Sequence, residues 1–260
     1  MASDRAVDVR AGFWRRLGAT VIDLLIILVP LQLIVAVLFV VTSGHIQMSS
    51  PVGFHATCSK LETVPNGLVP PPPAGSNFAQ ECNVYFIGAQ TAKFLRVERV
   101  TVEGTTANIV RLDYMLDPNG HPIDGVSVGW IMMLILITYL VAMETRAGAT
   151  LGSRVMRICV IDAAASVGPG VPLHKVILRY LFLLIGVIPI FVTQLVYFWL
   201  YGLDVDALEH MVASSSFWVL YAVSFLALLG WIIFLTVQIA KKRDPLYDRM
   251  AGTAVLRAFH

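Results

Sequence analysis

Long runs of apolar residues dominate the pattern of hydrophobic and polar positions along this chain. A helix needs about 20 mostly apolar residues to cross the hydrocarbon core of a bilayer. Four segments reach or approach that length, and the second is the shortest. The pattern therefore predicts an α-helical membrane protein, a four-transmembrane-helix bundle. The apolar runs extend from about Trp14 to Val41, Val126 to Met143, Leu178 to Trp199 and Phe217 to Ala240.

Between the first and second spans the pattern changes twice. From Ser43 to Ser76 the chain is rich in proline, glycine and serine, which predicts a stiff, polyproline-like surface loop without regular structure. The segments NVYFIG, KFLRVERVTVEG and ANIVRLDYML then combine β-branched and aromatic residues and are bounded by turn residues. In the last segment Val110, Leu112 and Tyr114 alternate with polar neighbours, as in a half-buried strand. We expect a small antiparallel sheet over the outer ends of the helices, with capping favoured over partner binding.

Composition agrees with a membrane protein, since 57% of the residues are hydrophobic and only 14% are charged. Soluble domains are usually about one quarter charged. Basic residues concentrate at or before the start of the first span, between the second span and the entry to the third, and after the fourth, and the positive-inside rule places these segments in the cytoplasm. They are Arg5, Arg10, Arg15 and Arg16; Arg146, Arg154, Arg157, Lys175 and Arg179; and Lys241, Lys242, Arg243, Arg249 and Arg257.

This charge pattern predicts a topology with both termini cytoplasmic, in the inner membrane of a bacterium, and with residues 42–125 outside. The connection 200–216 contains no lysine or arginine but three acidic residues, which also favours the outside. The expected organisation is a cytoplasmic N-terminus and first span 1–41, an outside loop and sheet 42–125, a second span 126–144, a cytoplasmic amphipathic loop 145–177, a third span 178–199, a short outside loop 200–216, a fourth span 217–240 and a basic tail 241–260.

The three cysteines fit this topology. Cys58 and Cys82 fall in the outside segment, where a disulfide can persist, whereas Cys159 falls on the reducing side. A Cys58–Cys82 disulfide would stabilise the segment by about 3 kcal/mol in the chain-entropy model. The alternative is two free thiols. The compartment favours the disulfide.

The cytoplasmic loop 145–177 contains RICVID, which resembles a short strand, and Pro172, which fits a helix start before the third span. Arg154 and Arg157 lie three positions apart among apolar residues, as on an amphipathic turn at the membrane surface. We favour contact with lipid headgroups over a phosphate-ligand site, because the glycines lack phosphate-loop spacing. Lys241, Lys242 and Arg243 form the corresponding membrane-surface group after the fourth span.

Four motifs, AGFWRRLGATVIDLL, GATLGSRVMRICVID, PLHKVILRYL and RDPLYDRMAGTAVLR, occur in this order along the chain. Together they resemble the RDD family of membrane proteins, which is named for one arginine and two aspartates. By that resemblance the three residues are Arg16, Asp23 and Asp248, with Arg15 a weaker candidate for the arginine. The resemblance implies either transport, with cation/proton exchange in some members, or an accessory-subunit role. The long segment Thr42–Gly125 departs from the family pattern and indicates a specialised partner.

Asp23 lies inside the first apolar run, seven residues after Arg16 and near the same helix face. A carboxylate at the centre of a bilayer costs about 3 kcal/mol, so it needs a partner or water. We expect Arg16 to pair with it, and Asp248 to approach if the tail folds back beneath the bundle. Such a cluster suits a monovalent cation or a proton, because one carboxylate can titrate while the other stays paired. The competing interpretation is a structural lock between the tail and the first helix, which we weight slightly higher.

Other polar groups give weaker indications. Glu144 ends the second span and is expected at the membrane interface, facing Arg146. No arrangement typical of a hydrolase triad, a cysteine–histidine pair or a zinc protease occurs, so the sequence does not predict an enzyme, a metal site or a cofactor.

Two roles follow as alternatives. The first is an accessory or scaffold subunit of a larger membrane complex, whose partners are the lipid bilayer and either further copies of the chain or other membrane-protein subunits. The second is a small cation- or proton-coupled transporter that uses the cluster of Arg16, Asp23 and Asp248. The long outer segment favours the first, and the charge cluster favours the second. Nothing in the sequence indicates a nucleic-acid partner.

Overall fold

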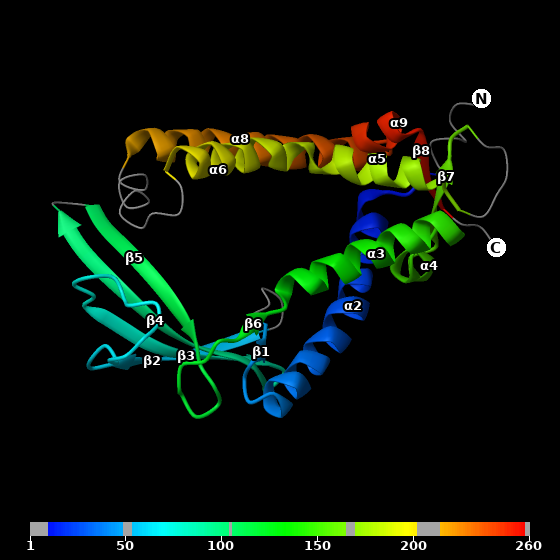
Figure 1. Cartoon of the computed structure of the whole chain (residues 1–260). Helices are drawn as coiled ribbons and strands as arrows, with labels where there is room; N and C mark the ends of the chain where they lie inside the picture. The colour runs from blue at the N-terminus through cyan, green and yellow to red at the C-terminus, as the bar shows by residue number, and fades with distance from the viewer. Residues whose placement is uncertain (1–9, 49–53, 104–105, 165–169, 202–213, 258–260) are drawn as a thin grey trace. The chain divides into compact units, whose positions relative to one another are not determined.

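The computed structural model describes residues 10–48, 54–103, 106–164, 170–201 and 214–257 of the 260-residue chain. The chain divides into two compact units. The helical unit comprises residues 1–26 and 135–260, and the sheet unit comprises residues 27–134. Figure 1 shows the order of the elements along the chain. Most of the predicted outside loop 200–216 lies beyond the described residues.

Four helices are long and apolar enough to span a membrane, as the apolar pattern predicted. The third span begins earlier than expected, directly after Pro172, whose fixed φ and missing N–H suit the start of a helix. It is also interrupted by a short 3₁₀ segment, so it consists of α5, η1 and α6. The spans are α2 (Phe13–Val41), α3 (Gly129–Ala147), α5 (Leu173–Leu183) with η1 (Leu184–Val187) and α6 (Ile188–Tyr201), and α8 (Ser215–Ala240).

The 3₁₀ segment of the third span packs closely against α8. A Cβ atom at Gly186 would overlap the indole ring of Trp231, so glycine permits this close approach. The indole Nε1 of Trp231 donates a hydrogen bond of 3.0 Å to the carbonyl oxygen of Leu183, which the interrupted helix leaves without its usual partner. Thr193 and Ser224 form a second polar contact, of 3.0 Å, between α6 and α8. These contacts hold the third and fourth spans side by side.

A small layer of structure lies at the ends of α2, α3 and α5 in the helical unit. Strand β7 (Ile158–Asp162), which the segment RICVID predicted, pairs antiparallel with β8 (Thr253–Arg257) from the tail. The short helices α4 (Leu151–Val155) and α9 (Leu246–Ala251) precede these strands. The tail therefore folds back onto the cytoplasmic loop of the predicted topology. Buried Val160, Val176 and Val255 form part of the core beneath this layer.

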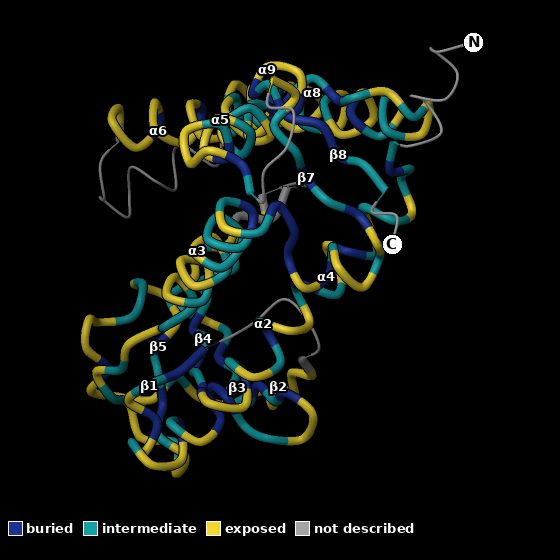
Figure 2. The backbone as a smooth tube through the Cα atoms, turned by 90° about the vertical axis from the view of Figure 1, so that its right-hand side faces the viewer, coloured by how far each residue is buried: buried dark blue, intermediate teal, exposed yellow. Residues whose placement is uncertain are grey.

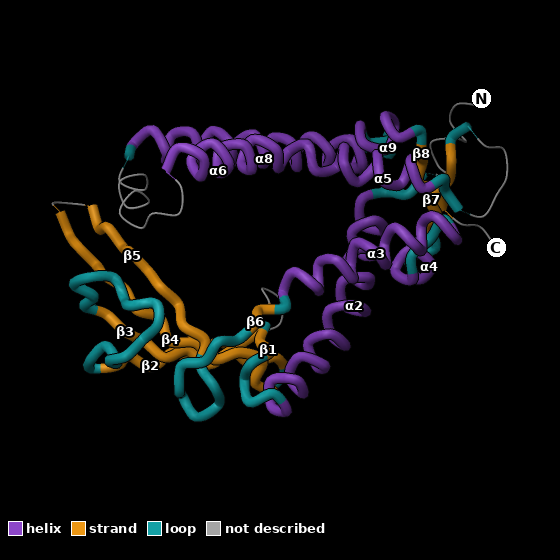
Figure 3. The backbone as a smooth tube through the Cα atoms, in the orientation of Figure 1, coloured by secondary structure: helices purple, strands orange, loops and turns teal. Residues whose placement is uncertain are grey.

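The sheet unit contains a four-stranded antiparallel sheet in the order β2-β3-β4-β5 (Figure 3). The three strands predicted from the alternating segments are present as β3, β4 and β5. Along β5, exposed Arg111 and Asp113 alternate with half-buried Leu112 and buried Tyr114, as expected. The strands are β2 (Phe54–Leu61), β3 (Phe78–Phe86), β4 (Ala89–Glu103) and β5 (Thr106–Met115), with a separate pair β1 (Ile46–Gln47) and β6 (Val126–Ser127).

The prediction that Ser43–Ser76 has no regular structure was wrong in part. Strands β1 and β2 both fall in this segment, because pairing with other strands outweighs its weak local preference. Cys58 lies directly opposite Cys82 in the register of β2 and β3, and the predicted disulfide between them is confirmed. The proline-rich part that follows does lack strands, and it covers one face of the sheet. Leu68 joins the buried core of the sheet, and the hydroxyl of Tyr114 donates to the carbonyl oxygen of Pro70 at 2.8 Å.

Candidate functional site

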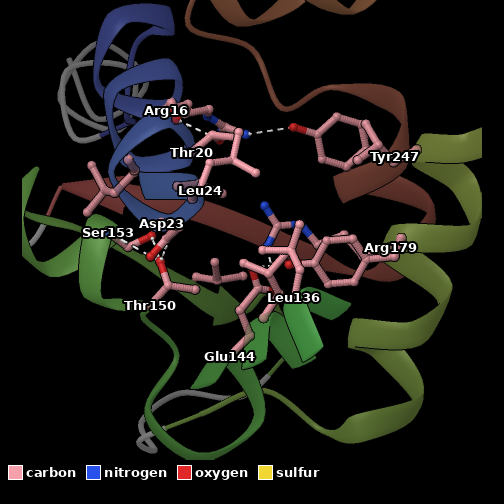
Figure 4. Close-up of a pocket in the computed structure, with 17 residues that line it drawn as sticks. Arg16, Thr20, Asp23, Leu24, Leu136, Glu144, Thr150, Ser153, Arg179 and Tyr247 are labelled. Atoms are coloured by element: carbon pink, nitrogen blue, oxygen red, sulfur yellow. Dashed lines mark hydrogen bonds and ion pairs between the residues drawn. The ribbon is translucent and has the colours of Figure 1, made fainter. Parts of the chain in front are cut away.

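A cavity of about 230 Å³ lies within the helical unit, among α2, α3, α4, α5 and the strands β7 and β8 (Figure 4). Two of the three family-motif residues, Arg16 and Asp23, line it. Their side chains point to different partners, as Figure 4 shows, because Arg16 is directed to Tyr247 of the tail and Asp23 to Thr150 of the loop. The cavity therefore lies between two separate polar centres.

The first centre is built around Asp248. Helix α9 places this side chain in the protein interior, where it is 0% exposed. Nη1 of Arg16 donates to Oδ2 of Asp248 at 2.8 Å, and Nε of Arg179 lies 2.8 Å from Oδ1. Gly252 ends α9 in the left-handed conformation, which turns the chain so that the hydroxyl of Thr253 lies 3.2 Å from Oδ1. The structure thus brings Arg16 and Asp248 together, and it adds Arg179.

Glu144 extends this centre, and the expectation that it faces Arg146 was wrong. The side chain is buried and accepts hydrogen bonds from Nη1 of Arg179 and from the hydroxyl of Tyr180, both at 2.9 Å. Helix α3 continues to Ala147, three residues past the expected end of the span, so Glu144 lies within its last turn. Opposite charges near the facing ends of two consecutive spans are compatible with this pair, but they do not single it out from Arg146.

Asp23 forms the second centre, and the structure contradicts its predicted pairing with Arg16. Oδ1 accepts from the hydroxyl of Tyr139 at 2.7 Å and from the backbone N–H of Gly152 at 2.8 Å. Oδ2 accepts from the hydroxyl of Thr150 at 2.5 Å. Seven residues separate Arg16 from Asp23, which is about 10 Å along a helix, and side chains tilt toward the helix N-terminus. Arg16 accordingly reaches back to the carbonyl oxygen of Ala11, away from Asp23.

Close packing of α4 against α2 makes the Asp23 contacts possible. A Cβ atom at Gly152 would overlap the carbonyl oxygen of Ala19, so only glycine allows the backbone N–H to reach the carboxylate. Thr150 caps the N-terminus of α4, because its side chain accepts from the N–H of Ser153. Tyr139 also accepts from the N–H of Leu151 at 2.9 Å. Asp23 therefore fixes the cytoplasmic loop of the predicted topology to the first span.

Charge is balanced in the first centre, and every carboxylate oxygen is hydrogen-bonded or ion-paired in both centres. Arg16, Asp248, Arg179 and Glu144 form a chain of alternating positive and negative groups. Every carboxylate oxygen of Asp23, Glu144 and Asp248 has a donor within 3.2 Å. Buried ion pairs of this kind hold segments in one geometry, and removing one partner is strongly destabilising. The arrangement acts chemically as a clasp, and we refer to Arg16, Asp248, Arg179 and Glu144 as the clasp.

Further polar contacts attach the tail and the N-terminal segment next to the clasp. The hydroxyl of Tyr247 accepts from Nη1 of Arg16 at 3.3 Å, and burial raises the pKa of Tyr247, so this group stays neutral. Arg10 pairs with Asp244 at 2.5 Å. Burial raises the pKa of Asp244 although Arg10 opposes the shift. The N–H of Ala11 bonds to the carbonyl oxygen of Val255 at 3.1 Å.

The basic residues assigned to the membrane surface lie away from the cavity. Arg154, Arg157, Lys241 and Arg243 are exposed, and Lys242 is half-buried. The apolar neighbours Leu151 and Val155 of α4 are exposed as well, as on an amphipathic helix at an interface. Contact of these residues with headgroups stays a prediction.

The fold defines an α-helical membrane protein with four candidate spans and a disulfide-linked β-sheet insertion. The model of the RDD family matches residues 10–68 and 123–252, and the chain belongs to the RDD family. Residues 69–122 lie between the two matched segments and contain strands β3, β4 and β5, so the departure expected over Thr42–Gly125 is confined to this shorter range. No curated protein and no solved structure matches the chain.

Proposed function

We propose that this RDD-family protein is a non-enzymatic accessory or scaffold subunit of a larger membrane complex, and that the clasp is its structural lock. The observation that carries the proposal is the pairing of Asp248, the carboxylate at the centre of the clasp, with two guanidinium groups. A cation site needs carboxylate oxygens that turn toward the ion, whereas both oxygens of Asp248 face guanidinium groups. The clasp joins α2, α3, α5 and α9, so it supports a fixed shape for the end of the helical unit.

The surfaces of the helices support contact with lipid or with other subunits. Exposed residues predominate along α6 (yellow in Figure 2), including Phe191 and Trp199. Helix α8 likewise presents exposed Leu226 and Ile233. Such surfaces are compatible with acyl chains and with the apolar helices of a partner, and neither requires chemistry at the clasp.

The confirmed disulfide supports the proposed orientation. Disulfides persist in oxidising compartments, so the sheet unit belongs outside and the termini belong in the cytoplasm of a bacterial inner membrane. Labelling of single cysteines introduced at Asn66 and at Arg154 tests this. Asn66→Cys should react with an impermeant reagent in intact cells, and Arg154→Cys should react only after lysis. Labelling of Arg154→Cys in intact cells contradicts the orientation.

The subunit role is tested on protein from its native membrane, purified in a mild detergent after cross-linking at low reagent concentration. We expect a defined mass above that of one chain, with a partner present in a fixed ratio to this protein. The test variant is Asp248→Asn. It should lose the fixed ratio of partner to this protein if the clasp holds the contact surface in shape. A monomeric protein that shows no cross-linked partner, and that catalyses ion flux, contradicts the proposal.

One observation favours the second candidate, a cation- or proton-coupled transporter: a cavity borders Asp23 and Glu144 within a candidate membrane region. Asp23→Asn separates the two roles, because asparagine keeps the shape and an acceptor but cannot titrate. Ion-driven pH change is measured in vesicles with equal amounts of folded wild type and variant. Flux in the wild type that Asp23→Asn abolishes supports transport, and no flux for any monovalent cation supports the subunit role.

A further inference from the structure

The cavity beside the clasp has a graded polarity along the helices. Three of its four charged residues, Arg16, Glu144 and Arg179, lie near the helix ends, and the fourth, Asp23, lies deeper and is already bonded to Tyr139, Thr150 and Gly152. Its apolar wall lies deeper in the spans: Leu24 is about 12 Å along α2 from Arg16, and Leu136 is about 12 Å along α3 from Glu144. A phospholipid in one leaflet has the same order of polarity, with a charged headgroup at the helix ends and acyl chains toward the middle.

Both guanidinium groups keep a donor that the clasp does not use. Within the described chain, the hydrogen bonds of Arg16 come from Nε and Nη1, and the contacts of Arg179 with carboxylates also use Nε and Nη1. Among the described residues Nη2 of each guanidinium has no hydrogen-bond partner, and both side chains line the cavity. Paired guanidinium donors are well suited to the oxygens of a phosphate.

The cavity wall carries both signs of charge in equal number. Arg16 and Arg179 are positive, while Asp23 and Glu144 are negative. Each carboxylate oxygen of Glu144 accepts one hydrogen bond, and an oxygen of this type has two lone pairs. A purely anionic or purely cationic headgroup meets attraction from one half of the wall and repulsion from the other. A zwitterionic headgroup satisfies both halves.

The cavity is also accessible from the side of the helices. Leu183 of α5 lines the cavity and is 38% exposed, while Leu24, Leu136 and Leu140 are half-buried. An acyl chain that lies along α5 can thus continue into the apolar part of the cavity without crossing the charged wall. A water-soluble ligand gains nothing from these leucine contacts.

We propose that this cavity binds a zwitterionic phospholipid with a primary amine in its headgroup. The phosphate accepts from Nη2 of Arg16 and Arg179, the ammonium group donates to Glu144, and the acyl chains pack on Leu24 and Leu136. The bound lipid acts as a filler between the first three spans beside the clasp. This assignment does not depend on the subunit role, because a transporter can hold the same lipid.

Native mass spectrometry of the full chain from nanodiscs tests the proposal. The nanodiscs contain equal amounts of phosphatidylethanolamine and phosphatidylglycerol. We expect the wild type to retain one phosphatidylethanolamine per chain, in preference to phosphatidylglycerol by about tenfold, which corresponds to about 1.4 kcal/mol. Equal retention of the two lipids, or a preference for phosphatidylglycerol, overturns the zwitterionic assignment.

Variants that fill the cavity locate the lipid. Leu136→Trp occupies the apolar part and should reduce phosphatidylethanolamine retention by about tenfold. Ile137→Trp is the matched control, since Ile137 is adjacent on α3, is 49% exposed and does not line the cavity. It should retain lipid as the wild type does. If Leu136→Trp fails to fold, Leu24→Phe makes a smaller change in the same wall, and equal retention in all folded variants overturns the assignment to this cavity.

Soluble phosphoethanolamine distinguishes a lipid from a free small zwitterion. The soluble compound has the same charged groups but no acyl chains, so millimolar concentrations should not displace the retained lipid from the wild type. Displacement of the lipid by millimolar phosphoethanolamine overturns the lipid assignment and makes the cavity a site for a soluble zwitterion.

Discussion

The helical unit and the sheet unit both contain arginine–carboxylate pairs, but the pairs lie in different surroundings. Asp248 of the clasp is 0% exposed and lies between two guanidinium groups. Asp113 of the sheet has a side chain that is 42% exposed, although its two hydrogen bonds to Arg96, at 2.9 and 3.0 Å, are equally short. Geometry therefore does not distinguish these pairs. Burial does, because an unpaired charge in the interior cannot be hydrated.

The two units are consequently held together by different means. The helical unit depends on buried polar contacts where loop, tail and spans meet. The sheet unit depends on strand pairing, an apolar core that includes Leu95 and Val97, and the Cys58–Cys82 disulfide. Substitutions of the same chemical kind in the two units should therefore have different effects.

The largest effect is expected for Asp248→Asn. Asparagine has nearly the same shape, but its amide nitrogen must face a guanidinium group and its charge is lost. Two half-buried arginines then share one neutral acceptor, which should lower the free energy of unfolding by about 3 to 5 kcal/mol. Denaturant-induced unfolding in detergent micelles measures the change. A loss below about 1 kcal/mol would place the clasp in the same class as the surface pairs of the sheet.

Removing the disulfide of the sheet unit is expected to have the next largest effect on stability, near the lower end of the range given for Asp248→Asn. Its cysteines are 24 residues apart in sequence, and a loop of this length corresponds to about 3 kcal/mol in the chain-entropy model. The double variant Cys58→Ala with Cys82→Ala should make the sheet unit more sensitive to protease at a given temperature. The control is Cys159→Ala, which changes a free cysteine and should leave proteolysis of the sheet unchanged.

Asp23→Asn should have a smaller effect than the same substitution at Asp248. The partners of Asp23 are neutral, and the amide oxygen can keep the bonds from Tyr139 and Gly152 while the amide nitrogen donates to Thr150. We expect a loss of about 1 to 2 kcal/mol, from the weakening of charge-assisted hydrogen bonds. The same unfolding measurement applies. Equal losses at Asp23 and Asp248 would show that charged partners make Asp248 no more sensitive to this substitution than neutral partners make Asp23.

Asp113→Ala should have little effect. The substitution removes the partner of Arg96 at a position where water can hydrate the remaining charge, so the loss should be about 0.2 to 1 kcal/mol. The pair should also weaken with added salt, because exposed charges are screened. A loss above about 2 kcal/mol, independent of salt, would show that this face of the sheet is covered in the native protein.

The spans and two adjacent members of the clasp could be predicted from the sequence, but the other two members could not. Long apolar runs determine spanning helices almost alone, and the resemblance to the RDD family pointed to Arg16 and Asp248. The pairing of Arg179 with Glu144 depends on how α3 and α5 are aligned, which no local pattern contains. The N–H of Gly152 is a backbone group, so the type of residue does not predict its hydrogen bond to Asp23.

Strand β2 of the sheet unit likewise could not be predicted from local sequence. Strands β3, β4 and β5 alternate apolar and polar residues, whereas β2 contains Cys58 and several small polar residues in a proline-rich context. Its place in the sheet is determined by pairing with β3 and by the disulfide. Non-local pairing of this kind outweighs local propensity, and for that reason β2 was missed.

The smallest expected effect concerns pH, and its sign differs between the two units. In the helical unit, burial raises the pKa of Asp244, so the folded state binds a proton at a higher pH than the unfolded state does. This contribution to stability decreases as the pH rises through the window between the ordinary and the raised pKa. In the sheet unit, the backbone N–H of His121 lowers the pKa of Asp117. That contribution is present above the ordinary pKa and is lost as the pH falls through the lowered pKa.

Unfolding of Asp244→Asn and Asp117→Asn, compared with the wild type between about pH 3 and pH 7, separates these two contributions. Asp244→Asn cannot bind the additional proton. The rise in the free energy of unfolding that acid produces in the wild type through Asp244 should therefore be absent. In Asp117→Asn, the fall in the free energy of unfolding that acid produces through Asp117 should be absent. If both substitutions change the pH dependence in the same direction, burial at Asp244 does not outweigh its pairing with Arg10 at 2.5 Å. The contrast between buried and hydrated carboxylates would then apply to the clasp but not to the contacts around it.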